Sequence, residues 1–224
     1  MEHRRTLLWL SIYAIAMAFL EAAVVVYLRQ LYYPENPLVI FPPRFMNQLD
    51  LAVELGREAS TVAMMLAVAF LAVRKNPTRI FAAFVYQFGV WDLFYYLWLK
   101  VCIGWPVSWT EWDVLFLIPW VWLGPWICPA LIALLFGLWG GRVLLQNGEV
   151  YLRRRGLWLF VLGSLLGLVS FLQPAVPVLL REGVEGFARF EPGGFWWGAY
   201  LPGLLLMAVG LFSGTAVRLP RLEG

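Results

Sequence analysis

The sequence predicts an all-α membrane protein, a polytopic bundle of about six transmembrane helices with both chain ends in the cytoplasm. Two observations predict the fold: 62% of the 224 residues are apolar and only 14% charged, and the apolar residues gather into long blocks. A soluble domain carries about a quarter charged residues. Each block has the roughly 20 residues that a helix needs to cross a bilayer. We therefore expect residues 1–224 to form a single transmembrane domain.

Six blocks are continuous enough to be spanning helices, because in lipid each backbone amide must be hydrogen-bonded within its own segment. They are Leu7–Leu28, Met46–Val73, Arg79–Cys102, Asp113–Trp139, Gly156–Leu179 and Phe195–Val217. The first begins with positive charges like a signal peptide, but its apolar run continues to Tyr27, so we expect it to be retained. The fourth is the least regular, since it is interrupted by Pro119, Gly124, Pro125 and Pro129. Such a break frees carbonyl groups that can coordinate ions.

The basic residues of the loops predict the orientation, because Lys and Arg accumulate on the cytoplasmic side. Eleven lie on one side: Arg4, Arg5, Arg74, Lys75, Arg79, Arg142, Arg153, Arg154, Arg155, Arg218 and Arg221. Five lie on the other: Arg29, Arg44, Lys100, Arg181 and Arg189. This asymmetry places both termini in the cytoplasm. The basic loops also account for the net charge of +3, so no nucleic-acid partner is needed to explain it. The partner we predict is the lipid bilayer.

Several chemistries are excluded by residues that the sequence lacks. The single histidine, His3, precedes the first apolar block. We therefore expect no histidine-ligated haem, no histidine-bound zinc and no Ser-His-Asp triad inside the bundle. Cys102 and Cys128 differ in predicted depth by roughly 20 Å at 1.5 Å per residue, so we expect no disulfide between them.

Glycines recur at four-residue spacing in the last three blocks. The pairs are Gly137-x-x-x-Gly141, Gly163-x-x-x-Gly167 and Gly210-x-x-x-Gly214. Such pairs allow two helix backbones to approach closely. We interpret them as packing contacts within one bundle rather than as a dimer interface.

Charged side chains inside the apolar blocks give the strongest functional signal. Four carboxylates, on three different helices, lie roughly 10–18 Å below the outer surface at a rise of 1.5 Å per residue. They are Glu21, Glu54, Glu58 and Asp92. Helical spacing places Asn47, Asp50, Glu54, Glu58 and Thr61 on one face of the second helix. In the same way, Asp92 and Tyr96 share a face of the third helix.

These charges are too costly to face lipid, so we expect them to face the bundle interior. Arg57 alone cannot neutralise them: one positive charge against four negative charges leaves −3, and Lys100 reduces the deficit only if it folds inward. The remaining charge must be protonated, hydrated or matched by a bound cation.

We therefore predict a substrate- or ion-binding site formed by six residues. They are Glu21, Glu54, Arg57, Glu58, Asp92 and Tyr96. The alternative is an ionic network that only sets the helix register. We interpret Asp50, Glu111 and Asp113 as interfacial residues of little weight.

Three sequence segments resemble those of a group of uncharacterised bacterial multi-span membrane proteins. They are ELGREAST (54–61), GVWDLFYYLWLK (89–100) and WDVLFLIP (112–119). The resemblance covers mainly the second to fourth blocks. It implies a bacterial inner-membrane location and carries no implication for mechanism.

Three functions are compatible with these features. The first is transport of an ion or small molecule, with protons or a cation entering the acidic site from the outer face. Six spans are few for a transporter, so we expect a homodimer or a larger membrane complex.

The second is an intramembrane enzyme acting on a lipid-linked substrate, with an oxygen-ligated Mg²⁺, Mn²⁺ or Ca²⁺ and with Glu58 or Asp92 as general base. The third is an accessory subunit of a membrane complex, which does not require an unbalanced acidic cluster.

Overall fold

A computed structural model of the chain describes residues 2–44, 46–118 and 120–218. Within these ranges six helices are long and apolar enough to cross a membrane. They are α1 (Glu2–Tyr32), α2 (Gln48–Ala72), α3 (Pro77–Ile103), α4 (Ile127–Leu145), α5 (Arg154–Leu172) and α7 (Trp197–Gly214). The predicted all-α polytopic bundle is confirmed. Two residues used in the sequence predictions, Pro119 and Arg221, lie outside the described ranges.

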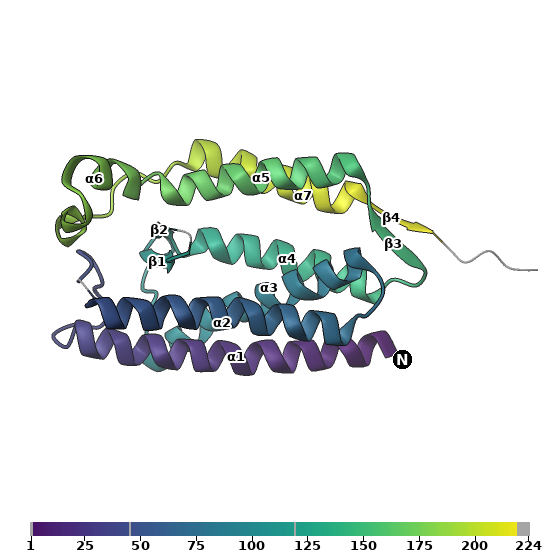
Figure 1. The fold of residues 1–224 in the computed structure, drawn as a ribbon, viewed down its shortest axis with the longest axis horizontal. Coiled ribbons are helices and arrows are strands. Elements are labelled where there is room, and N and C mark those ends of the chain that lie inside the picture. Colours follow the sequence, from purple (N-terminus) through teal and green to yellow (C-terminus); the bar gives the residue numbers. More distant parts are fainter. Residues whose placement is uncertain (1, 45, 119, 219–224) are drawn as a thin grey trace, which may run out of the picture.

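The helices run alongside one another in layers (Figure 1). One layer contains α5 and α7, the middle one α3 and α4, and the third α1 and α2. The most extensive packing joins α5 to α7, α3 to α4, and α1 to α3, whereas α2 packs more sparsely against α3 and α1. The chain begins at the same end of the bundle as β3 (Glu149–Leu152) and β4 (Thr215–Arg218), which form an antiparallel pair.

Glycines permit the close approach of α5 and α7. A Cβ atom added at Gly163 would lie 2.5 Å from the carbonyl oxygen of Gly203. One added at Gly210 would lie 2.6 Å from the carbonyl oxygen of Gly156. Real Cβ atoms do not come this close to backbone, so these positions require glycine. The interpretation of Gly163 and Gly210 as packing residues within one bundle is confirmed.

The α3–α4 pair uses glycine in the same way, but not at every predicted position. A Cβ atom at Gly140 would lie 2.6 Å from the carbonyl oxygen of Ala82. In contrast, a Cβ atom at Gly137 or at Gly167 would meet nothing within 4 Å. The four-residue spacing therefore identifies the helices that pack closely, but the required glycine of α4 is Gly140, which lies outside the predicted pair, and both Gly210 and Gly214 of α7 contact backbone.

The prediction of a helix in the first half of the fourth span is wrong. Instead of one helix over Asp113–Trp139, strands β1 (Trp112–Phe116) and β2 (Trp122–Pro125) form an antiparallel hairpin, and α4 begins at Ile127. Pro125 has no amide hydrogen to donate, glycine precedes it, and the aromatic residues around it suit a strand. The hairpin packs on α5, where the indole of Trp122 stacks on Phe171.

The predicted fifth span is also divided. The expected helix Gly156–Leu179 ends at Leu172, and a second helix, α6 (Ala175–Glu182), follows Pro174. Proline at this point removes a backbone donor from the helical ladder. A 3₁₀ helix, η1 (Val184–Arg189), completes the connection to α7.

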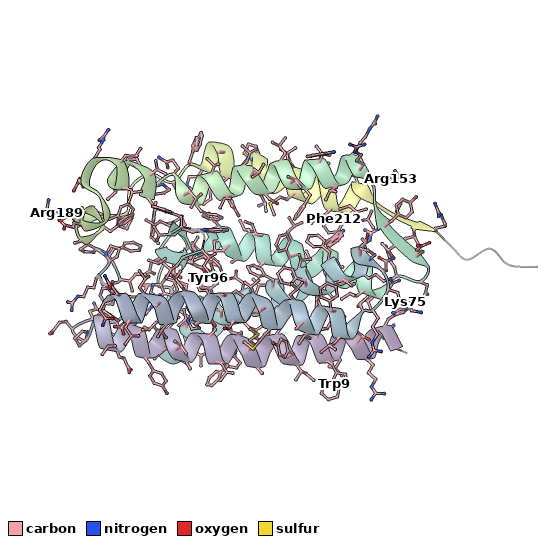
Figure 2. The ribbon with its side chains drawn as sticks, viewed as in Figure 1. Trp9, Lys75, Tyr96, Arg153, Arg189 and Phe212 are labelled. Carbon is pink, nitrogen blue, oxygen red and sulfur yellow. The ribbon has the colours of Figure 1, made fainter. Side chains whose placement is uncertain are left out.

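Positive charges mark the two ends of the bundle. Lys75 and Arg153 lie at one end and Arg189 at the other (Figure 2). Tyr96, one of the predicted site residues, lies in the half of the bundle nearer Arg189. This is the half that the sequence predicts to face away from the cytoplasm.

A buried tryptophan connects α4 to the C-terminal end of α7. The Trp139 side chain is fully buried, and its Nε1 donates hydrogen bonds to the Leu211 carbonyl oxygen at 3.0 Å and to Thr215 Oγ1 at 2.9 Å. We expect Trp139→Phe to lower stability by about 1 kcal/mol through the lost hydrogen bonds. Thermal unfolding in detergent measures this, with Trp158→Phe on the exposed face of α5 as the control. Equal unfolding temperatures for the two variants would contradict the prediction.

Candidate functional site

The polar face that the sequence predicts on α2 points into the bundle. Glu54, Glu58 and Thr61 are all buried. The helix begins at the N-cap Asn47, whose side chain accepts a hydrogen bond from the Asp50 amide at 2.8 Å. This cap sets the start of α2, and the three- and four-residue spacing then carries the polar face inward.

Arg57 joins carboxylates from two helices. Its Nε and Nη2 atoms donate to Glu54 Oε2 at 2.9 and 2.7 Å, and its Nη1 atom pairs with Glu21 Oε1 on α1. The second oxygen of Glu21 accepts a hydrogen bond from Thr61 Oγ1 at 3.3 Å. The structure thus brings Glu21, Glu54 and Arg57 together into one group with one positive and two negative charges.

Glu58 contacts the β1–β2 hairpin instead. Both of its carboxylate oxygens lie 3.0 Å from the backbone nitrogen of Leu117, which donates to them, and the Ile118 amide also donates. Carbonyl groups freed in the interrupted fourth block remain a predicted feature, whereas the contacts seen at Leu117 and Ile118 are made by backbone amides. The hairpin presents amide hydrogens, which suit an anion, and an acidic side chain of the protein occupies them.

A second acidic centre lies where α1, α3 and β1 meet. Asp92 on α3 is 6% exposed and Asp113 on β1 is 3% exposed. Arg29, which is 4% exposed, donates from Nη2 to Asp113 Oδ1 at 3.3 Å. Its guanidinium also lies over the Trp105 ring, 4.0 Å from the centroid. This centre too has one positive and two negative charges.

Three polar atoms at this centre are buried without a hydrogen-bond partner among the described residues. They are Asp92 Oδ2, Asp113 Oδ2 and Arg29 Nη1. Asp92 and Asp113 also repel each other electrostatically. Buried polar groups in proteins are almost always paired, so unpaired atoms gathered from three elements mark a place where a proton or small polar ligand fits.

Two tyrosines lie beside the acidic groups. The Tyr96 ring is buried and packs against Tyr95, Trp105 and Trp126, with centroid distances of 5.0, 6.1 and 5.2 Å. Tyr96 therefore forms an apolar wall of the second centre. Tyr95 is within electrostatic range of Arg57 in the first centre and of Arg29, Asp92 and Asp113 in the second, so it lies near both centres.

The sequence predictions missed two residues of the second centre. Arg29 was assigned to a loop and Asp113 to the interface, yet both are buried in the bundle. The four-residue spacing of Glu21, Val25 and Arg29 would have indicated one helical face, because α1 continues to Tyr32. No comparable signal existed for Asp113, since its position depends on the hairpin.

Lys100 does not fold inward. Its Nζ atom donates to the backbone oxygens of Gly104 and Pro106 at 2.9 and 2.8 Å. The charge deficit therefore persists when Arg29 and Asp113 are added to the predicted cluster. Two arginines and five carboxylates give a net charge of −3.

The acids are distributed over separate contacts. Within residues 2–44, 46–118 and 120–218, no three His, Cys, Asp or Glu side chains gather closely enough to hold a metal ion. Glu21 and Glu54 contact Arg57, Asp113 contacts Arg29 with Asp92 in electrostatic range of Asp113, and Glu58 is bound by the hairpin. The described part of each centre thus offers two carboxylates.

The fold and these charged contacts define an integral membrane protein with six spanning helices and a polar interior between α1, α2, α3 and the hairpin. Comparisons with protein-family models, with curated proteins and with solved structures find no match to the chain. Its function must therefore be inferred from the geometry of the site.

Proposed function

We propose that this protein binds a proton at a carboxylate site in the extracytoplasmic half of a bacterial inner membrane. Proton binding would be coupled there to the transport of an ion or small molecule, with both termini in the cytoplasm. One observation carries the proposal: Asp92 and Asp113 are buried within electrostatic range of each other, Arg29 pairs with Asp113, and one oxygen of each aspartate has no partner among the described residues.

The charge balance favours a proton as the missing partner. The Arg29 guanidinium matches the charge of Asp113, so the ionised form of buried Asp92 would be an uncompensated charge, which is strongly unfavourable. Protonation of one carboxyl group removes that charge and converts its free oxygen into a donor. A divalent cation is less well supported, because two carboxylates would have to be supplemented by about four further oxygen ligands, such as water, in an enclosed centre.

The arrangement of the two centres supports a path for the proton. The Arg57 side chain is 20% exposed and that of Glu21 11% exposed, whereas the Asp92 and Asp113 centre is enclosed. Tyr95 is within electrostatic range of both centres and has a hydroxyl group that can donate and accept. A proton would enter at the Glu21–Arg57–Glu54 group and pass toward Asp92. Because a six-helix bundle is small for a transporter, we expect it to work as a homodimer.

Infrared difference spectroscopy tests proton binding directly. The protein reconstituted in lipid is titrated across the acidic to neutral range, and the carbonyl stretch of protonated carboxyl groups is followed. We expect a band that is absent in Asp92→Asn and present in the control Glu149→Gln, which removes an exposed acid on β3. An unchanged band in Asp92→Asn would rule out Asp92 as the proton site.

The same variant separates a proton site from a structural role. Asparagine has the shape of aspartate without its charge, and Asp92 Oδ2 has no partner to lose among the described residues. We therefore expect Asp92→Asn to unfold within about 1 kcal/mol of the parent protein. A loss of several kcal/mol would instead support a purely structural network.

Proton movement is measured in vesicles that contain a pH-sensitive dye. A potassium diffusion potential, set with valinomycin, drives protons inward through the reconstituted protein. We expect flux in the parent protein and in Glu149→Gln, and at least a tenfold loss in Asp92→Asn. Equal flux in Asp92→Asn and the parent would contradict the proposal.

A further inference from the structure

A groove of about 330 Å³ opens between α1 and α2 at the end of the bundle that carries Lys75. It is lined by Thr6, Trp9 and Leu10 of α1 and by Val68, Leu71 and Ala72 of α2. Apart from the Thr6 hydroxyl, these side chains offer an apolar surface. Trp9 is 59% exposed beside the groove, where it suits the boundary between lipid chains and headgroups (Figure 2).

The groove exists because the side-chain contacts between α1 and α2 lie toward the other end of the helices. Arg57 pairs with Glu21, Thr61 donates to Glu21, and the Tyr32 hydroxyl donates to Asp50. At the groove end, Ala69 of α2 is buried in a cluster that includes Leu10 of α1 and Ala82 and Ala83 of α3. The small side chain of Ala72 leaves the space open.

Positive side chains border the groove. Arg4 and Arg5 immediately precede Thr6, and Arg74 and Lys75 follow Ala72 by two and three residues. All four are exposed, and the three ion pairs found in the described part of the chain involve none of them. Four exposed cations thus lie within three residues of the lining of this apolar groove, at the end of the bundle where it opens.

We infer that this groove binds an anionic phospholipid, with its phosphate at the cationic rim and an acyl chain against the apolar floor. Basic clusters at the membrane surface attract anionic headgroups, and the apolar lining accepts the chain. A second copy of this protein is a poorer occupant, because a symmetric contact at this groove would bring two cationic rims together.

Lipid retention in native mass spectrometry tests the inference on the full chain in neutral detergent. Phosphatidylglycerol and phosphatidylcholine with identical acyl chains are the probes. We expect phosphatidylglycerol to bind at least tenfold more tightly. The double variant Arg74→Gln with Lys75→Gln should lower the affinity ratio of phosphatidylglycerol to phosphatidylcholine roughly tenfold, because each cation near the surface contributes several-fold in affinity.

Two further variants separate a built site from diffuse attraction. Arg153→Gln with Arg154→Gln removes two exposed cations that do not line the groove, and it should leave phosphatidylglycerol binding unchanged. Ala72→Leu fills the groove while keeping every charge, and it should weaken phosphatidylglycerol binding several-fold. Leucine favours helix, and Ala72 is exposed at the end of α2, so folding should be preserved.

Three results would overturn the inference. The first is equal retention of the two lipids by the parent protein. The second is an equal loss of phosphatidylglycerol binding in the Arg153/Arg154 and Arg74/Lys75 variants, which would mean general charge attraction. The third is a lipid-independent dimer that Ala72→Leu dissociates, which would identify a second copy as the occupant. Should Ala72→Leu unfold, charge reversal by Arg74→Glu with Lys75→Glu decides the question, since unchanged lipid preference there also overturns it.

Discussion

Replacement of Arg57 by leucine is expected to destabilise the protein by about 3–5 kcal/mol, the cost of breaking a buried ion pair by removal of one partner. Arg57 contributes three contacts at once, two to Glu54 and one to Glu21. Without it, two carboxylates from different helices would face each other without a counter-charge. The contact between α1 and α2 would change from attractive to repulsive.

Two companion variants show whether the loss of stability arises from the uncompensated acids. Combining Arg57→Leu with Glu21→Gln and Glu54→Gln removes all three charges and should restore most of the lost stability. Arg74→Leu removes an exposed arginine just beyond α2 and should unfold like the parent protein. Reversible unfolding in mixed micelles measures the free energies. If the triple variant is as unstable as Arg57→Leu, packing rather than charge explains the effect.

Replacement of Gly163 by alanine is expected to cost about 2–3 kcal/mol, because an added methyl group has no space at a close-packed contact. It would lie 2.5 Å from the Gly203 carbonyl oxygen and 2.6 Å from the Met207 backbone nitrogen. Both neighbours belong to the backbone of α7, so no side chain can rotate away. The two helices would have to separate along their shared length.

Gly167 provides a matched control one helical turn away. It is buried in the same helix, but a Cβ atom there would meet nothing within 4 Å. We expect Gly167→Ala to be neutral or slightly stabilising, because alanine favours helix over glycine. Equal destabilisation by the two substitutions would show that α5 and α7 are not packed as described.

Much of the fold could be predicted from the sequence. Whether a segment spans the membrane depends on its own length and composition, which can be read from that segment alone. Each of the six spanning helices coincides in large part with a predicted block. The errors fall where the chain turns inside the bundle, at the β1–β2 hairpin and at Pro174. A hairpin packed against other helices satisfies its backbone through tertiary contacts, which the local sequence does not reveal.

The candidate site could be predicted only in part, for a related reason. Helical spacing was sufficient to place Glu54, Glu58 and Thr61 on one inward face of α2. Which acid pairs with which cation depends on helix rotation and on the hairpin. The structure divides the predicted cluster into two centres and adds Arg29 and Asp113 to it. The predicted deficit of three negative charges is unchanged in size but is distributed differently.

The polar contacts between α1 and α2 also bear on how the chain is made. A helix that enters lipid alone with Asp50, Glu54, Arg57 and Glu58 exposed would face a steep insertion penalty, and Glu21 adds a smaller one for α1. Because α1 is synthesised first, it must remain beside the insertion machinery until α2 emerges. The two segments then partition together as a helical hairpin whose charges are already matched. Assembly of this part of the protein thus begins during translation, before the later helices exist.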